Sequence, residues 1–136
     1  MLDKKYIGFL KDLKSLKSNA ENLLKGDAGN NFEDRKCHES IVYLKKEIED
    51  AIHDMELLSK TTLEGKLVLN SQGRFNLDTA QELYFTCGSP LEMFIDGEWY
   101  RGRVESDGKD YYFYNYEGEN IPLDEGMKAR IRVDRG

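Results

Sequence analysis

Cysteine, proline, histidine and tryptophan are scarce in this sequence. Its 136 residues include two Cys, two Pro, two His and one Trp. Cys37 and Cys87 stand far apart, which is typical of free thiols in a reducing compartment rather than of a disulfide framework. No stretch approaches the roughly 20 apolar residues of a membrane-spanning helix, and the first residues lack the apolar core of a secretory signal. We therefore expect a cytoplasmic protein that does not enter a membrane.

The scarce residues also fail to form a reactive set. Structural zinc sites use Cys or His pairs about two to four residues apart, whereas Cys37 and His38 are adjacent and His53 and Cys87 stand alone. The sequence contains neither a strand-turn-helix motif around a nucleophile nor a glycine-rich phosphate loop. We predict that the protein binds no metal or cofactor and is not an enzyme.

Acidic side chains outnumber basic ones, and the net charge is −6. Residues 1–62 carry 11 basic and 12 acidic side chains, whereas residues 63–136 carry 9 basic and 14 acidic ones. Such a balance argues against nonspecific binding to DNA or to a membrane surface, which needs a positive field. It fits a protein partner that has a basic surface.

Apolar residues of the first half recur in alternating steps of three and four, the spacing of a heptad seam. One series is Leu2, Tyr6, Phe9, Leu13, Leu16, Ala20 and Leu23, and the other is Cys37, Ile41, Leu44, Ile48, Ala51, Met55 and Leu58. A polar segment from Gly26 to Asn31 separates them, and Asn30 with Glu33 has the spacing of a capping box. The pattern predicts a coiled-coil-like antiparallel hairpin over residues 1–62.

Further apolar positions widen each series, so the hairpin needs a second surface to cover it. They are Leu10, Leu24, Ile52 and Leu57. This surface is either the second half of the chain or another copy of the hairpin. We expect the seam of the hairpin, or of a dimer, to contain Leu13, Leu16, Leu23, Leu44, Ile48 and Met55.

The period changes to two after Gly65, which indicates strands. Turns are predicted at residues 71–73, 96–97, 107–108 and 117–118, and Asp-Gly is the strongest short hairpin signal. Residues 78–83 are ambiguous, and one helical turn is one interpretation of them. Six or seven short strands favour closure into a barrel, so the predicted fold class is α+β, with an SH3-like small β-barrel over residues 63–136.

Aromatic and basic residues alternate in this second half. Tyr112, Tyr114 and Tyr116 share one face of a strand, and Tyr111 and Phe113 share the other. One set belongs to the core, and the other is either buried too or forms a tyrosine-rich recognition surface. A second pattern places Arg101 and Arg103 on one strand and Lys128, Arg130 and Arg132 on another. These cations form a basic face if the strands are neighbours, or else pair with Glu92, Glu98 and Glu105.

Two resemblances rest on these residues. The landmarks Leu69-Asn70, Gly73-Arg74-Phe75, Thr86-Cys87-Gly88, Leu91-Glu92 and the Trp99 strand resemble an uncharacterised domain family that is carried on phages and mobile elements of Gram-positive bacteria. That resemblance implies no particular activity, but it implies a setting in which counter-defence and accessory roles are common. The segments FIDGEWYRGRV and YFYNYEGENI resemble Tudor and other SH3-like barrels. This implies an aromatic cage for a methylated cation, built from Trp99 or Tyr100, Phe113 or Tyr114, and Tyr116, with Phe94 as the earlier ring.

The combined prediction is a non-enzymatic protein-binding module, an accessory or counter-defence inhibitor similar in role to anti-CRISPR proteins, that acts by steric occlusion. The expected binding residues are Trp99, Tyr100, Arg101, Arg103, Tyr112, Tyr114, Tyr116 and Arg130. One alternative is a nucleic-acid-binding barrel that uses Trp99, Arg101, Arg103, Tyr114 and Arg130. Another is a structural, dimeric component of a larger assembly.

Overall fold

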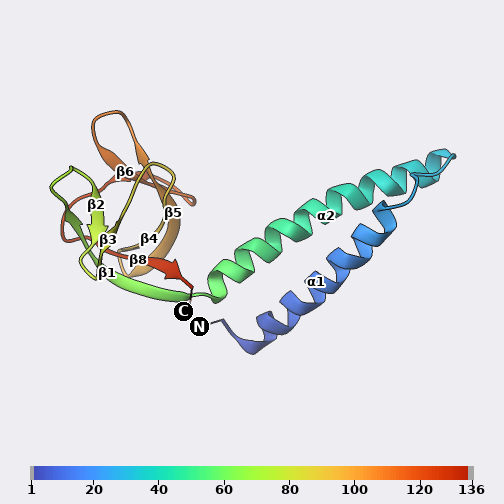
Figure 1. Ribbon diagram of the computed structural model, residues 1–136, viewed down its shortest axis with the longest axis horizontal. Coiled ribbons are helices and arrows are strands. Elements are labelled where there is room, and N and C mark those ends of the chain that lie inside the picture. The colour runs from blue at the N-terminus through green and yellow to red at the C-terminus, as the bar shows by residue number, and fades with distance from the viewer. Residues whose placement is uncertain (1, 135–136) are drawn as a thin grey trace. The chain divides into compact units, whose positions relative to one another are not determined.

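The computed structural model describes residues 2–134, which form two helices followed by eight strands. The helices are α1 (Lys4–Leu24) and α2 (Phe32–Ser59), and the strands are β1 (Thr61–Leu69), β2 (Phe75–Leu77), β3 (Ala80–Tyr84), β4 (Pro90–Ile95), β5 (Glu98–Ser106), β6 (Tyr111–Asn115), β7 (Asn120–Pro122) and β8 (Lys128–Val133). The chain divides between Lys60 and Thr61 into a helical unit and a sheet unit (Figure 1).

Side-chain caps start both helices. The carboxylate of Asp3 accepts a hydrogen bond from the Lys5 N–H, and the Asn31 side chain accepts one of 2.7 Å from the Asp34 N–H at the start of α2. The capping box predicted at Asn30 and Glu33 therefore lies one residue too early. Asn30 instead offers its backbone carbonyl to the Arg35 guanidinium, and the cap is formed by the next Asn along the chain.

The two helices run antiparallel and share a small apolar core (Figure 1). Leu10, Ile48 and Ile52 are buried, with Leu13 and Met55 packed against them. The other expected seam residues are not buried. Leu16, Leu23 and Leu44 are 45%, 64% and 47% exposed. Cys37 is exposed as well, although its place in the heptad series predicts a core position.

The eight strands form one antiparallel sheet in the order β3-β2-β1-β8-β4-β5-β6-β7. The predicted β4-β5-β6 meander is present, and its first turn uses Asp96 and Gly97, both with positive φ. Residues 78–83, which the sequence left ambiguous with one helical turn as an interpretation, contain most of β3. The strands curve around a common interior (Figure 1).

The closed barrel expected from the sequence is not formed. β8 inserts between β1 and β4, so β3 and β7 are the two edge strands of the sheet. Within residues 2–134, β3 and β7 do not pair with each other. Both end strands are poor partners for closure. β7 has three residues and ends at Pro122, and a register shift between Asn76 and Leu77 disturbs the β2-β3 pair.

The core of the sheet unit lies on the inner face of the strands. It contains Leu67, Leu77, Ala80, Phe85, Leu91, Met93, Val104, Phe113, Leu123 and Ala129. Gly102 permits the closest approach in this core. A Cβ atom at that position would collide with the Tyr114 carbonyl oxygen and lie 2.6 Å from the Phe113 ring, so β5 can pass under that ring only with glycine there.

Candidate functional site

One face of the sheet gathers five cations and five aromatic rings of the sheet unit. β4 lies between β8 and β5, so Glu92 faces Arg130 on one neighbour and Arg101 on the other, and Phe94 faces Trp99. Alternation along each strand places their second neighbours on the same face. We call this surface the outer face and define it by Glu92, Phe94, Trp99, Arg101, Arg103, Tyr112, Tyr114, Tyr116, Lys128, Arg130 and Arg132. The two basic strands are thus separated by one strand rather than adjacent.

A buried carboxylate organises the arginines of β8. Glu92 is 6% exposed, and its two oxygens accept hydrogen bonds from Arg130 Nε at 2.8 Å and from Arg132 Nε at 2.7 Å. Burial raises the pKa of Glu92, but the hydrogen bonds from Arg132 and Arg130 outweigh it, so the pKa of the carboxyl lies below its ordinary value. The carboxylate therefore stays charged and fixes both guanidinium groups in place.

Two rings next to this carboxylate are covered by the protein's own cations. Phe94 and Trp99 meet edge to face with ring centroids 5.1 Å apart. The Lys128 ammonium lies 4.7 Å from the Phe94 centroid, and the Arg130 guanidinium lies 4.0 Å from the Trp99 centroid. A methylated cation of the kind that a Tudor domain holds would have to displace them, so this ring pair is not an open aromatic cage.

The tyrosines of β6 and the following turn form a second ring pair on the outer face. Tyr114 and Tyr116 are 5.9 Å apart and are 38% and 52% exposed. The Arg103 guanidinium lies 4.6 Å from the Tyr114 centroid, and its Nε donates to Glu105. On the opposite side of the strand, Phe113 is fully buried. The tyrosine stripe therefore divides into residues that pack on the core and residues that face outward.

Of the eight binding residues predicted from the sequence, the structure brings seven to the outer face and places Tyr100 elsewhere. Tyr100 packs against the sheet core, and its hydroxyl donates to Glu98 at 3.2 Å. Phe94, Lys128 and Glu92 belong to the outer face but were not predicted as binding residues. The signal for Glu92 is a lone charge within the apolar strand Pro90–Ile95.

The Cys87 thiol contacts a carboxylate of the sheet unit. Cys87 donates a 3.0 Å hydrogen bond to Glu105, which raises the pKa of the thiol and keeps it protonated. Across residues 2–134, no three His, Cys, Asp or Glu side chains are grouped so that they could hold a metal ion. Neither helix in this part of the chain is long and apolar enough to cross a membrane.

The fold and the outer face define a two-unit α+β protein with a helical hairpin and an antiparallel sheet that has a basic, aromatic side. Residues 65–131 match the family described as a domain of unknown function, DUF5348. This agrees with the resemblance to an uncharacterised domain family, and the matched residues include all of the outer face except Arg132. No match was found among curated proteins or among solved structures.

Proposed function

We propose that the protein is a non-enzymatic binding protein whose outer face binds single-stranded nucleic acid. The observation that supports this proposal is the gathering of five cations and five aromatic rings on one side of the sheet. The proposal takes up the nucleic-acid alternative from the sequence, because the outer face is locally positive although the sheet unit as a whole is acidic.

Most acidic residues of the sheet unit lie outside its strands, and most basic residues lie within them. Nine of the 14 acidic residues in residues 63–136 lie outside the strands, whereas six of the 9 basic residues lie within them. The five cations of the outer face are accompanied there by Glu92, Glu105 and, on β1, Glu64. The local excess of positive charge attracts phosphates, while the carboxylates of the turns lie at the strand ends.

The exposed rings add a contact that suits unpaired bases. Tyr114 and Tyr116 present ring surface to solvent beside the Arg103 guanidinium. A base that stacks on an aromatic ring contributes about 1–3 kcal/mol and is accepted largely irrespective of sequence. Bases in a duplex are already stacked on one another, so we expect the outer face to prefer single strands.

A second candidate function is the binding of a protein partner with a basic surface, as in the inhibitor predicted from the sequence. The acidic turns support it. The pKa of Tyr100 is raised by its hydrogen bond to Glu98, and the negative charges of Glu117 and Asp96 raise it further. A basic partner would contact these turns rather than the outer face.

Fluorescence anisotropy with labelled mixed-sequence single-stranded DNA and RNA, and with the matching duplexes, tests the proposal on the full chain. We expect single strands to bind at low salt and the affinity to fall steeply as salt rises. The variant Arg103→Ala/Tyr114→Ala should lose most of this binding. The matched control is Arg74→Ala/Tyr84→Ala, since Arg74 lies 5.1 Å from the Tyr84 ring centroid elsewhere in the same unit.

Two results would contradict nucleic-acid binding by the outer face. One is the absence of binding to any oligonucleotide even at low salt, which would favour the protein-partner candidate. The other is an equal loss of binding in the two double variants, which would place the contact outside the outer face.

A further inference from the structure

The helical unit has a second apolar stripe that its own packing leaves open. On α1, Phe9, Leu16 and Leu23 are seven residues apart and are 54%, 45% and 64% exposed. On α2, Leu44 is 47% exposed and Ala51 follows it by seven residues. These residues lie beside the buried core of the hairpin, which uses Leu10, Ile48 and Ile52.

Helix geometry puts both stripes on the same side of the hairpin. At about 100° per residue, Phe9, Leu16 and Leu23 lie roughly 60–100° to one side of the line along which α1 faces α2. Leu44 and Ala51 are displaced from the corresponding line of α2 by a similar angle in the same rotational sense. Because the helices run antiparallel, equal rotations in one sense turn both stripes toward one side.

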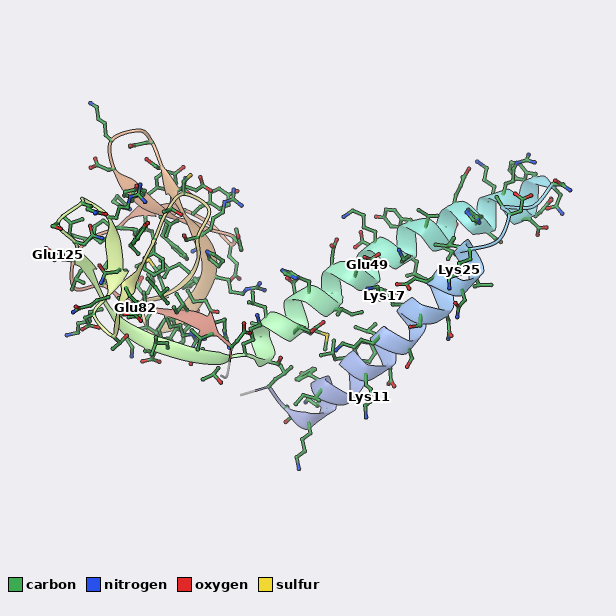
Figure 2. All side chains as sticks on the ribbon, in the orientation of Figure 1. Lys11, Lys17, Lys25, Glu49, Glu82 and Glu125 are labelled. Carbon is green, nitrogen blue, oxygen red and sulfur yellow. The ribbon has the colours of Figure 1, made fainter. Side chains whose placement is uncertain are left out.

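The opposite side of the hairpin is charged and internally paired. Lys14 on α1 forms an ion pair of 3.8 Å with Glu56 on α2. Two i,i+4 pairs accompany it, Lys17–Glu21 and Lys45–Glu49. Figure 2 shows the long side chains of Lys17 and Glu49 on their respective helices. Ion pairs thus occupy one side of the hairpin, and the apolar stripe occupies the other.

We propose that the apolar side binds a second copy of the chain, so that two hairpins form a four-helix bundle. The apolar side chains of the two helices alternate along the hairpin axis when Leu10 lies beside Ile52. Leu16 then falls between Ala51 and Leu44, and Phe9 and Leu23 fall beyond them at either end. Each projecting side chain on one helix thus lies opposite a gap on the other. A two-fold-related copy presents the same spacing, so its side chains fit these gaps.

The area of this side is sufficient for a dimer. α1 has 21 residues and is about 31 Å long at 1.5 Å per residue. Two helices side by side are roughly 20 Å wide, so each copy contributes about 600 Å² and the dimer buries roughly 1,200 Å² in total. This total is at the lower end of the range for stable complexes.

The test is the molar mass of the full chain by light scattering after size-exclusion chromatography, over a series of protein concentrations. We expect twice the mass of the 15.8 kDa chain for the wild type. Leu16→Gln/Leu44→Gln should have the mass of one chain and an unchanged helical circular dichroism signal, because both side chains are already exposed in the single hairpin. Leu16→Ala/Leu44→Ala should behave in the same way while keeping high helix propensity.

The matched control is Ile7→Gln/Val42→Gln. Ile7 and Val42 are 49% and 50% exposed, but helix geometry puts them on the charged side. This variant should keep the doubled mass. A wild-type protein with the mass of one chain at every concentration would overturn the proposal. Dissociation of the Ile7→Gln/Val42→Gln variant would overturn it equally, because the contact would then not be specific to the apolar side.

Discussion

Arg132 makes two hydrogen bonds to Glu92, from Nε at 2.7 Å and from Nη2 at 3.1 Å. The Glu92 carboxylate is almost fully buried and also accepts a hydrogen bond from Arg130. One acidic side chain in the middle of the sheet thus holds two cations of the outer face. The stability of the sheet unit and the arrangement of its candidate binding residues therefore depend on the same group.

We predict that Glu92→Gln destabilises the sheet unit by about 3 kcal/mol, because it leaves two largely buried guanidinium groups without their counter-charge. Chemical denaturation followed by Trp99 fluorescence measures the effect. Glu64→Gln is the control, since the Glu64–Lys128 pair is 3.8 Å long and half exposed, and its loss should change the free energy of unfolding by less than about 1 kcal/mol. Equal effects of the two substitutions would show that Glu92 has no special role.

The lowered pKa of Glu92 predicts a loss of stability in acid. The folded state holds this carboxyl in its charged form below the ordinary pKa of 4.5. The charged Glu92 carboxylate therefore contributes fully to stability above pH 4.5, and this contribution disappears as the pH falls through the lower pKa of the folded state. The difference in free energy of unfolding between wild type and Glu92→Gln should shrink as the pH is lowered from neutral to below 4.5. A difference that is constant with pH would contradict this assignment.

Gly102→Ala should destabilise the sheet unit by at least about 1–3 kcal/mol, because the added methyl group meets the Tyr114 carbonyl oxygen and the Phe113 ring. The β5-β6 pair would have to separate to admit it. Gly118→Ala is the control in the next turn, where a Cβ atom meets nothing within 4 Å and φ is not positive. Thermal unfolding of both variants checks the prediction, and a stable Gly102→Ala protein would refute it.

The start of α2 provides a prediction for the helical unit. Asn31→Ala removes the side-chain acceptor of the Asp34 N–H and should cost about 1 kcal/mol. Asn30→Ala should have little effect, because Asn30 uses only its backbone carbonyl in the contact with Arg35. The two substitutions can be compared by thermal unfolding followed by helical circular dichroism. A larger loss of stability for Asn30→Ala than for Asn31→Ala would instead support the capping box predicted at Asn30 and Glu33.

The elements predicted correctly from the sequence are those with a strong local signal. Heptad spacing predicts the hairpin, and the Asp96-Gly97 turn predicts the β4-β5 pair. β3 was missed because Gln81, Glu82, Leu83 and Tyr84 are all exposed, so its residues show no alternation between apolar and polar types. Local pattern therefore predicts an element only where one of its faces is buried.

The candidate site was predicted in part for a related reason. Alternating arginines and tyrosines indicate which side chains share a face, but not which strands lie together. Arg130 reaches Glu92 across 38 residues of sequence, and this contact depends on the insertion of β8 beside β4. The role of Glu92 and the open order of the strands follow from that long-range pairing, which periodicity within a single strand does not encode.

The short β7 strand limits how these molecules can associate through their sheets. The Leu123 N–H donates to the Tyr111 carbonyl of β6. Because backbone hydrogen bonds alternate along an antiparallel strand, Ile121 also directs its N–H toward β6. The N–H positions of Asn120 and Pro122 therefore point to the open edge. Proline has no N–H, and Asn120 is then the one donor that β7 offers to an incoming strand. Fibre growth by sheet extension needs a receptive strand at both ends. Since β7 offers so little to pair with, sheet extension is hindered at that end of the sheet.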